Sequence, residues 1–561
     1  MHDERPSLLF EDPAVHQRRW LLLGVMCLSL VLVVMSITSL NVAAPRLQQD
    51  LGATATQLHW IIDSYGLVFA GLLLPAGALG DRYGRKGALL LGLALFALGL
   101  LVSGVADDAD QVIAGRAIMG AGSAFVMPAT LSLISAVFPP EERTRAIAVW
   151  AGFAGAGGAI GPVVAGLLLE EFWWGSAVLV NLPVVAAAFA AVAVFSPRSR
   201  DARSTPLDVG GAVLSLVGML SLIYGIIEGA ERGWTDPLVV AAFAAAAVLV
   251  SGFVAWELRA GHPMLPLELF RDRRFSVGSG AIMLAFFTMF GFFFLATLYV
   301  QYVLGYTPLE AGLATLPMAA VMVVLAPRSA ALGERFGPGR VMAGGFAVSA
   351  LSLGVFSLVT THSPYLLLAL GFMLFGTGLA MTAAPATGLV MSAVPLDKAG
   401  VGSAVNDTTR EFGAALGIAV FGTLVGSVYR SNADLAGTGV PTEAAEAASE
   451  SIGAAWGVAQ GLPGGGGALL AEAQNAFVDA FRLSNGVSLV VALVAGGLVL
   501  ATLGGRGAGA AGAEAPAGEV VGEVAGEAGA ALGADRESVQ AGGPALEPAL
   551  AVDAVDANEA T

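Results

Sequence analysis

The stretch LGDRYGRKG at residues 79–87 is a short polar segment that separates two long apolar runs. A reduced copy, LGERFGPGR, stands at residues 332–340 in the same setting. Internal repeats of this kind are typical of membrane proteins built from two related units. The two copies therefore predict a duplicated chain in which each half carries a polar hinge between consecutive membrane spans.

The composition of the chain also indicates a membrane protein. Of the 561 residues, 56% are apolar and only 12% are charged. Apolar runs of about 20 residues recur, and a helix of that length crosses the roughly 30 Å of bilayer hydrocarbon. A soluble protein of this size needs far more charge on its surface, which excludes a multidomain soluble protein. We expect an all-α polytopic membrane protein with no nucleic-acid partner and no obligate protein partner.

Fourteen apolar runs are long enough to be spans, and the basic residues predict their orientation. Cationic loops stay in the cytoplasm. With the N-terminus inside, 21 of the 27 Lys and Arg residues fall in cytoplasmic segments, 4 in external segments and 2 within spans. We therefore expect both termini in the cytoplasm. The expected spans are 20–43, 58–79, 88–105, 112–137, 146–169, 176–195, 209–227, 238–256, 277–303, 311–326, 341–359, 365–394, 401–428 and 487–503.

The positions of the two hinges define the domain organisation. The first hinge joins spans 2 and 3 and the second joins spans 10 and 11, so spans 1–6 match spans 9–14 and spans 7 and 8 are an insert. The segment 505–561 has no aromatic residue and carries ten acids against two arginines, which predicts a disordered tail. The expected parts are a cytoplasmic N-terminus (1–19), an N-terminal six-helix half (20–195), a two-helix insert with linkers (196–276), a C-terminal six-helix half (277–504) with an external loop (431–484), and the acidic cytoplasmic tail (505–561).

Within the external loop, residues 468–481 are amphipathic and are expected to lie at the membrane interface before the last span.

No motif for a cofactor or for enzyme chemistry stands out. Cys27 is the only cysteine, the five histidines lack ligand spacing, and no phosphate-binding loop of the Walker type is present. We therefore expect no metal site, no cofactor and no enzymatic activity. The energy for any transport has to come from an ion gradient, for which we expect protons, or from the cargo's own gradient.

Two charges within the spans of the N-terminal half are candidate functional residues. Asp63 in span 2 and Arg116 in span 4 lie at similar depth near the outer ends of their spans, so they are expected to meet across the cavity. A charge inside the membrane is costly unless it faces water or a partner, and function is the usual reason for its presence. We expect Asp63 to bind protons and cargo in competition. The alternatives are snorkelling of Asp63 at the interface and a purely structural role for Arg116.

A second group of charges lies in span 13. Asp407, Arg410 and Glu411 stand at positions i, i+3 and i+4, which places them on one face of a helix with Arg410 able to pair with either acid. The hypotheses are a second proton site or a charge lock near the cytoplasmic end of the cavity. The alternative is a static ion network that holds span 13 to its neighbours.

Several segments resemble the major facilitator superfamily, and in particular its fourteen-span drug:proton antiporter branch, the EmrB/QacA-like subfamily. They cover residues from about 20 to 430 and the last span. The segments are GALGDRYGRK (77–86), RAIMGAG (116–122), GGAIGPVVAG (157–166), FWWGSAVLVNLP (172–183) and GSAVNDTTREFGAALGIAVFG (402–422). The resemblance implies the major facilitator fold, with two six-helix halves, two inserted central helices and fourteen spans in all.

The resemblance also implies roles for two motifs. Asp81 is expected close to the N-terminal end of span 13, near residues 400–402, as a cytoplasmic latch, because the helix dipole favours a carboxylate there. The glycines of span 5 are expected to form a dry seal between helices, with ordinary helix packing as the alternative. The gating motif comprises Gly77, Asp81, Arg82, Gly84 and Arg85, and the antiporter motif comprises Gly157, Gly161, Pro162 and Gly166.

One departure from the family pattern affects the choice of proton carrier. The branch usually has an acid in span 1, and this sequence has Ser36 at that place. Asp63 is therefore the leading candidate. Together, these features predict proton-coupled antiport of amphiphilic or cationic small molecules, such as drugs or antibiotics, across a bacterial cytoplasmic membrane. The alternatives are a dedicated exporter of an endogenous metabolite or self-made antibiotic and, less favoured, a non-transporting sensor or lipid-handling protein.

Overall fold

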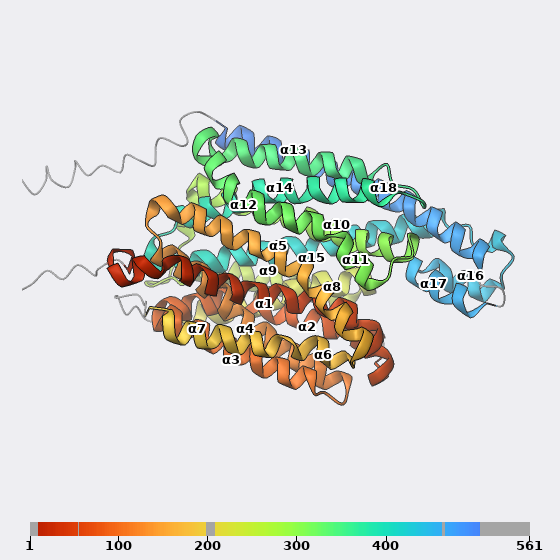
Figure 1. Cartoon of the computed structure of the whole chain (residues 1–561), viewed down its shortest axis with the longest axis horizontal. Helices are drawn as coiled ribbons and strands as arrows, with labels where there is room; N and C mark the ends of the chain where they lie inside the picture. Colours follow the sequence, from red (N-terminus) through yellow and green to blue (C-terminus); the bar gives the residue numbers. More distant parts are fainter. Residues whose placement is uncertain (1–8, 54, 198–207, 463–465, 505–561) are drawn as a thin grey trace, which may run out of the picture. The chain divides into compact units, whose positions relative to one another are not determined.

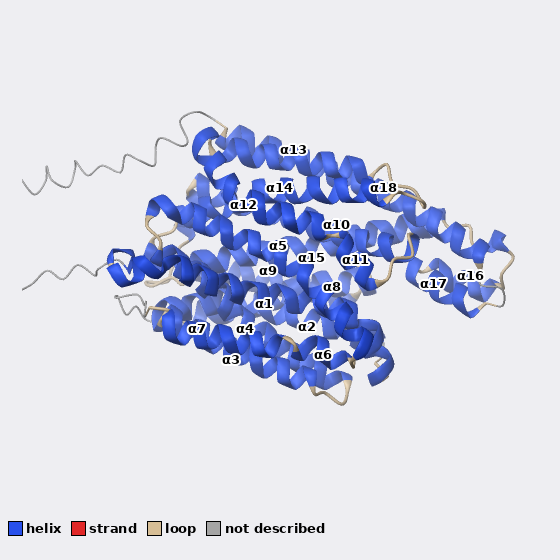
Figure 2. Ribbon diagram, in the orientation of Figure 1, coloured by secondary structure: helices blue, strands red, loops and turns tan. Residues whose placement is uncertain are grey.

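The computed structural model describes residues 9–53, 55–197, 208–462 and 466–504 (Figure 1). The described chain is built from α-helices joined by short loops (Figure 2). The linker 198–207 and the acidic tail 505–561 lie outside the described residues. The helices are α1 (Pro13–Leu51), α2 (Ala55–Tyr83), α3 (Arg85–Gly104), α4 (Ala109–Val137), α5 (Pro140–Glu171), α6 (Trp174–Leu179), α7 (Asn181–Phe195), α8 (Val209–Arg232), α9 (Pro237–Glu257), α10 (Arg273–Leu298), α11 (Pro308–Ala314), α12 (Leu316–Phe336), α13 (Pro338–Phe356), α14 (Tyr365–Ser392), α15 (Ala399–Asn432), α16 (Thr442–Ser449), α17 (Ile452–Gly461) and α18 (Gly467–Leu503).

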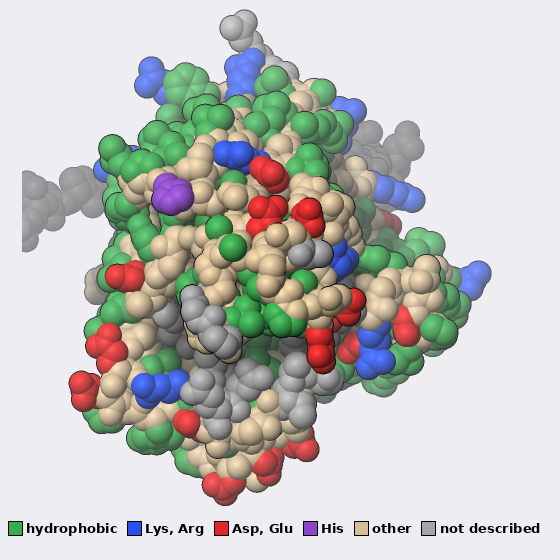
Figure 3. All heavy atoms as spheres, turned by 90° about the vertical axis from the view of Figure 1, so that its right-hand side faces the viewer, with side chains coloured by type: hydrophobic (Ala, Val, Ile, Leu, Met, Phe, Trp, Pro, Cys, Tyr) green, Lys and Arg blue, Asp and Glu red, His purple; other side chains and the backbone are tan. Residues whose placement is uncertain are grey.

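The helices confirm the predicted all-α membrane architecture. Among the described residues, thirteen helical segments are long and apolar enough to cross a membrane. Eleven single segments and two helix pairs, α6 with α7 and α11 with α12, cover thirteen of the expected spans. The fifth expected span is covered by α5, whose 32 residues pack against α1 and α12. Apolar side chains are exposed on the outer helices, among them Val248 and Leu498, as contact with lipid requires. Figure 3 views one end of the bundle, where apolar and charged side chains are mixed.

The segment 468–481 differs from its prediction. It does not form a separate interfacial helix but is the first part of α18, which runs unbroken to Leu503. No proline interrupts this helix, and Phe481 stacks on Tyr299 with ring centres 5.2 Å apart. Leu469 and Phe477 on the same stretch are buried. Protein packing, rather than the membrane interface, therefore covers the apolar face of this segment.

The two halves repeat the same helix pairings. In the N-terminal half, α1 packs on α5, α4 packs on both α2 and α3, and α3 packs on α7. In the C-terminal half, α10 packs on α15, α14 packs on both α12 and α13, and α13 packs on α18. The hinges also match, since Gly84 and Gly337 both have positive φ, of 114° and 88°. Glycine adopts this backbone without strain, which explains its presence in both hinges.

Close helix contacts between small residues recur in both halves. A methyl group on Gly92 of α3 would stand 2.7 Å from the carbonyl oxygen of Gly122 on α4. A methyl group on Gly345 of α13 would stand at the same distance from the carbonyl oxygen of Gly378 on α14. Such contacts maximise van der Waals packing, which replaces the hydrophobic effect between helices in lipid. They fix the α3–α4 and α13–α14 pairs as rigid parts of each half.

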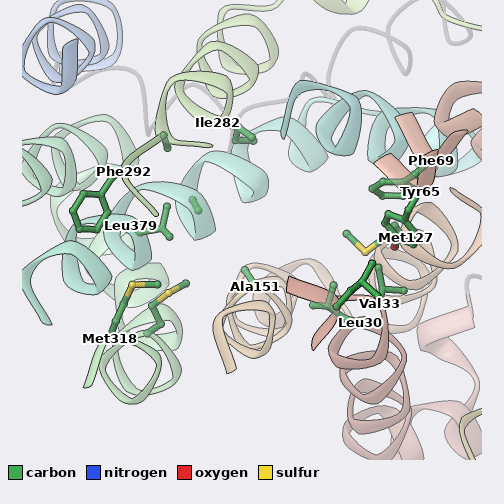
Figure 4. Close-up of a cluster of buried hydrophobic side chains, with 14 of the residues drawn as sticks. Leu30, Val33, Tyr65, Phe69, Met127, Ala151, Ile282, Phe292, Met318 and Leu379 are labelled. Atoms are coloured by element: carbon green, nitrogen blue, oxygen red, sulfur yellow. The ribbon is translucent and has the colours of Figure 1, made fainter. Parts of the chain in front are cut away.

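Large apolar side chains fill the interior of both halves and form one cluster that continues from one half to the other. Figure 4 shows one group around Leu30, Tyr65 and Met127 and another around Phe292 and Leu379. The halves meet where α2 packs on α15 and where α5 packs on α12 and α14. The insert helices α8 and α9 pack on each other, and α8 also packs on α2 and α15. The insert therefore covers the seam between α2 and α15.

Candidate functional site

The gating motif forms a latch between the halves. The carboxylate of Asp81, at the end of α2, accepts hydrogen bonds from the backbone N–H groups of Gly400 (3.0 Å) and Val401 (3.1 Å). These groups belong to the first turn of α15, where the helix dipole favours negative charge. Arg85 donates from Nε to the same carboxylate at 3.1 Å and also bonds the carbonyl oxygen of Leu396. Asp81 thus lies at the N-terminal end of span 13, the position that the resemblance to the family implied. We call this contact the latch and this end of the bundle the latch end.

Glycines allow the close helix approach on which the latch depends. A methyl group on Gly77 would stand 2.6 Å from the carbonyl oxygen of Gly400, and one on Gly400 would stand 2.7 Å from the Asp81 carboxylate. Gly84 turns the chain from α2 into α3 and so brings Arg85 back to Asp81. Arg82 is not part of the contact with Asp81, because its guanidinium lies over the Tyr83 ring at 5.2 Å.

The second hinge does not form an equivalent latch. Glu334 takes the place of Asp81 but is exposed to solvent. By the repeat, its partner would be the first turn of α5, which already carries Glu141 and Glu142. Pro140 at the start of that turn offers no N–H group. The helix end that would receive Glu334 therefore lacks one N–H donor and already holds an acid, Glu142, that is paired with Arg19. Among the described residues the latch is found on one side of the seam only.

Asp63 and Arg116 come together near the end of the bundle away from the latch. Arg116 is 2% exposed, and its Nε donates to the carbonyl oxygen of Ile61 at 3.1 Å. Its guanidinium also lies over the Tyr65 ring, 4.5 Å from the ring centre. Asp63 stands between these two contact points on α2 and is within electrostatic range of Arg116. The structure therefore brings together the pair that was predicted from depth alone.

An acid that the sequence did not single out joins this pair. Glu228 of α8 is buried and lies within electrostatic range of Asp63. It forms an ion pair with Arg232 one turn further along α8. The available signal was a lone glutamate directly after the apolar run 209–227. We call Asp63, Tyr65, Arg116 and Glu228 the Asp63 site.

Ser36 lies close to the same arginine. It is 5% exposed and donates a hydrogen bond from Oγ to the carbonyl oxygen of Val33 at 2.9 Å. A small cavity inside the N-terminal half is lined by Ser36, Arg116 and Asn181. An acid at position 36 would therefore face Arg116 from the other side. With serine there, the cationic charge of Arg116 is directed toward α2 and Asp63.

The charges of span 13 form a buried cluster on α15. Arg410 lies with Nη1 3.8 Å from Oδ1 of Asp407, and its Nη2 bonds the hydroxyl oxygen of Thr387 on α14 at 3.0 Å. Its guanidinium is also held between the rings of Trp150 (5.3 Å) and Phe286 (5.1 Å), from α5 and α10. Arg410 thus contacts helices of both halves.

Several polar atoms of the α15 cluster have no hydrogen-bond partner among the described residues. Asn406 donates from Nδ2 to Oδ1 of Asp407 at 3.1 Å, but Oδ2 of Asp407, Nε of Arg410 and Nε1 of Trp150 are buried and unpartnered. Unsatisfied buried groups are costly and are usually retained for a functional reason. We call Asn406, Asp407, Arg410 and Glu411 the α15 cluster. Thr387 and Trp150 were missed because only tertiary packing brings them to it.

The α15 cluster lies close to both the latch and the Asp63 site. Asp407 is seven residues from Gly400 along α15, a distance of roughly 10 Å in a helix. In the other direction, Glu411 is within electrostatic range of Tyr65, and the guanidinium of Arg116 lies over the ring of Tyr65. Polar and charged groups therefore connect the latch, the α15 cluster and the Asp63 site through α15 and α2.

The antiporter motif of α5 packs in two directions. A methyl group on Gly157 would stand 3.1 Å from the carbonyl oxygen of Val31, and Gly161 contacts Thr38 and Ser39, all on α1. Pro162 and Gly166 face α11 of the other half: a methyl group on Gly312 would stand 3.0 Å from Pro162 Cβ, and one on Gly166 would stand 3.2 Å from Leu309 Cβ. The motif therefore joins α1 closely and also touches the other half, as a seal at the seam requires.

Comparisons with known proteins agree with this geometry. The family model of the Major Facilitator Superfamily matches residues 26–418. The methyl viologen resistance protein SmvA of Salmonella typhimurium is 36% identical over 485 residues, covering 85% of this chain and 97% of that protein. The tetracenomycin C resistance and export protein of Streptomyces glaucescens is 34% identical over 512 residues, covering 89% and 95%. The multidrug efflux pump LfrA of Mycolicibacterium smegmatis is 36% identical over 463 residues, covering 82% and 92%.

The fold also matches a solved structure. The human organic anion transporter TETRAN superimposes with a TM-score of 0.55 at 16% identity, over 86% of this chain and 99% of that chain. At this identity the likeness concerns the fold alone. The chain belongs to the major facilitator superfamily, a family of membrane transporters and not of enzymes.

Proposed function

We propose that this protein exports amphiphilic or cationic small molecules, such as drugs or antibiotics, in exchange for protons, and that it belongs to the fourteen-span drug:proton antiporter branch. The observation that carries this proposal is the half-buried Asp63, which lies within electrostatic range of a buried arginine and of a second acid within the spans. A carboxylate in such a place binds either a proton or a cation. The names of the relatives as resistance and efflux proteins support the same function.

The proposed cycle uses the latch and the Asp63 site in turn. With the latch closed, Asp63 is accessible from the end opposite the latch, which we place outside the cell. Asp63 takes up a proton there as cargo leaves. The halves then rock, the bonds between Asp81 and α15 break, and the site opens to the cytoplasm, where cargo displaces the proton. The α15 cluster moves with the latch because both lie on α15.

The placement in a bacterial cytoplasmic membrane with both termini inside is part of this proposal. It rests on the excess of Lys and Arg in the segments at the latch end.

The export function is tested in inside-out membrane vesicles whose interior is acidified by respiration. We expect ethidium, a monovalent amphiphilic cation, to accumulate in vesicles that contain the protein and to leave when nigericin collapses the pH gradient. Vesicles without the protein are the control. Equal ethidium uptake in both preparations, repeated across a broad panel of cationic dyes, would refute the function.

A dedicated exporter of a self-made antibiotic is the second candidate. The similarity to the tetracenomycin C resistance and export protein favours it, because the matched region covers 95% of that protein. The two candidates differ in breadth of cargo. Resistance to a single compound in a broad susceptibility panel supports the dedicated exporter, whereas resistance to several unrelated cations supports the multidrug exporter.

A further inference from the structure

Packing between α2 and α8 places Glu228 at the same end of the bundle as Asp63, away from the latch. Trp60 of α2 stacks on Tyr224 of α8 with ring centres 6.0 Å apart, and Leu220 lies over Gly71, where a methyl group would stand 2.8 Å from Leu220 Cδ2. Residue numbers rise along α2 as they fall along α8, so the helices are antiparallel. Asp63 lies eight residues before Gly71, and Glu228 lies eight residues after Leu220. Counted from the Gly71–Leu220 contact, the two acids lie level, and counted from the Trp60–Tyr224 contact they lie seven residues, or roughly 10 Å, apart along the helix axes. Both contacts place Glu228 within about two helical turns of Asp63, which agrees with the electrostatic interaction between the two acids.

The two arginines that neutralise these acids differ in their freedom to move. Arg116 is buried and fixed by the Ile61 carbonyl and the Tyr65 ring. Arg232 has a side chain that is 48% exposed, whereas the side chain of its partner Glu228 is 7% exposed. An exposed ion pair contributes little, and a long arginine side chain reorients readily into water. Glu228, by contrast, is buried, so a cationic partner stabilises its charge more than it stabilises an exposed acid.

The surroundings of Glu228 suit an amphiphilic cation. The stacked rings of Trp60 and Tyr224 lie beside it on the two facing helices, and aromatic faces attract organic cations. Arg232 has a second acid within electrostatic range, Asp236 at the start of α9, toward which it can turn when it leaves Glu228. A cargo cation can therefore take its place at Glu228 without leaving any charge unpaired.

We propose that Glu228 is a specificity-determining carboxylate of the export path and that Arg232 is its resident counter-ion, which the cationic group of the cargo replaces. This inference rests on the proposed export function and extends its site to the insert. The insert helix α8 then contributes directly to cargo recognition, in addition to covering the seam between the halves. Asp63 remains the group that exchanges protons.

The proposal gives opposite predictions for the two members of the ion pair. The KM for ethidium is measured in energised inside-out vesicles for wild type, Glu228→Gln, Arg232→Gln and the double variant, at matched protein levels. Glu228→Gln is expected to raise KM about tenfold with little change in maximal rate, because one charge-assisted contact is lost. Arg232→Gln is expected to lower KM, because the competing cation is gone. The double variant is expected to resemble Glu228→Gln.

The control is Glu257→Gln, which neutralises another buried acid of the insert that lies on α9, and it is expected to leave KM unchanged. A structural ion pair predicts lower protein levels or maximal rate in both single variants with unchanged KM, and that result overturns the proposal. A higher KM in both single variants also overturns it, because Arg232 would then order Glu228 for the cargo rather than compete with it. Absence of transport by the wild type for ethidium and for every dye of the cationic panel refutes the export function itself. Normal wild-type transport with unchanged KM in both variants refutes only the role of Glu228.

Discussion

The guanidinium of Arg116 lies face-on against the ring of Tyr65, 4.5 Å from its centre, and the two residues belong to the adjacent helices α4 and α2. The hydroxyl group of Tyr65 is hydrogen-bonded to Ser123 at 2.7 Å, which fixes the ring under the arginine. Arg116 therefore holds its positive charge next to Asp63 through a directional contact. This geometry gives the arginine an electrostatic role and a packing role at once.

Replacing Arg116 with lysine is expected to reduce export strongly although the positive charge is kept. The planar guanidinium of Arg116 lies over the Tyr65 ring and also donates to the Ile61 carbonyl. The compact ammonium group of lysine cannot make both contacts in this geometry. We expect at least a tenfold lower initial rate of ethidium efflux, since contacts of this kind contribute about 1–2 kcal/mol each. Arg430→Lys, at an exposed site on α15, is the control and is expected to match wild type. A rate for Arg116→Lys within twofold of wild type contradicts the packing role.

The latch predicts different outcomes for the two copies of the hinge. Asp81→Asn removes the charge that faces the first turn of α15 and the charge that pairs with Arg85. Charge-assisted hydrogen bonds contribute about 1.5–3 kcal/mol each, so we expect the transport rate to fall tenfold or more. The matched change Glu334→Gln in the second hinge is expected to have little effect, because Glu334 is exposed. Equal losses in both variants, measured as ethidium efflux at matched protein levels, would argue against a one-sided latch.

The close packing of α5 on α1, on which the proposed seal depends, is tested by two neighbouring glycines. A methyl group on Gly161 would stand 2.7 Å from the carbonyl oxygen of Met35, whereas the nearest atom to one on Gly158 is 3.9 Å away. Overpacking costs about 1–3 kcal/mol, so we expect Gly161→Ala to lower the midpoint of thermal unfolding in detergent and Gly158→Ala to leave it unchanged. Gly161→Ala is also expected to increase proton leak in vesicles. A Gly161→Ala protein as stable and tight as Gly158→Ala would exclude the seal.

The α15 cluster is expected to depend on charge balance. Arg410→Gln leaves Asp407 buried without its cation, and breaking a buried pair in this way costs about 3–5 kcal/mol. We expect a large loss of folded protein in detergent, which size-exclusion chromatography and thermal unfolding measure. The double variant Asp407→Asn with Arg410→Gln is expected to recover much of the stability. If the double variant is no more stable than Arg410→Gln, the pair does not balance charge within the fold.

The sequence predicts the parts of this site that depend on helix order and depth. The repeated hinge fixes which spans correspond, and the helix dipole at the start of α15 explains why Asp81 binds there. Opposite directions of spans 2 and 4 were enough to bring Asp63 and Arg116 together. The meeting of Asp63 and Arg116 follows from topology, which apolar runs and basic loops reveal, whereas the position of Asp81 at α15 was implied by the resemblance to the family.

The remaining contacts depend on rotations and crossing points that no periodicity reveals. Glu228 stands just after the run 209–227, and only the packing of α8 on α2 turns it toward Asp63. Thr387 and Trp150 lie more than twenty and two hundred residues from Arg410 in the chain and meet it only in the folded bundle. Arg82 belongs to the hinge motif, but its side chain lies over Tyr83 rather than at Asp81. The stretch 468–481 was wrongly separated from the last span because its amphipathic pattern fits buried packing as well as an interface.

The central claim is that Asp63 carries the proton that is exchanged for cargo. The most direct test is ethidium-induced proton release from acidified inside-out vesicles, followed with a pH-sensitive dye, for wild type, Asp63→Asn and the exposed-acid control Glu446→Gln on α16. We predict proton release on addition of ethidium for wild type and Glu446→Gln, and none for Asp63→Asn at equal protein levels. Proton release by Asp63→Asn equal to that of wild type would contradict the claim.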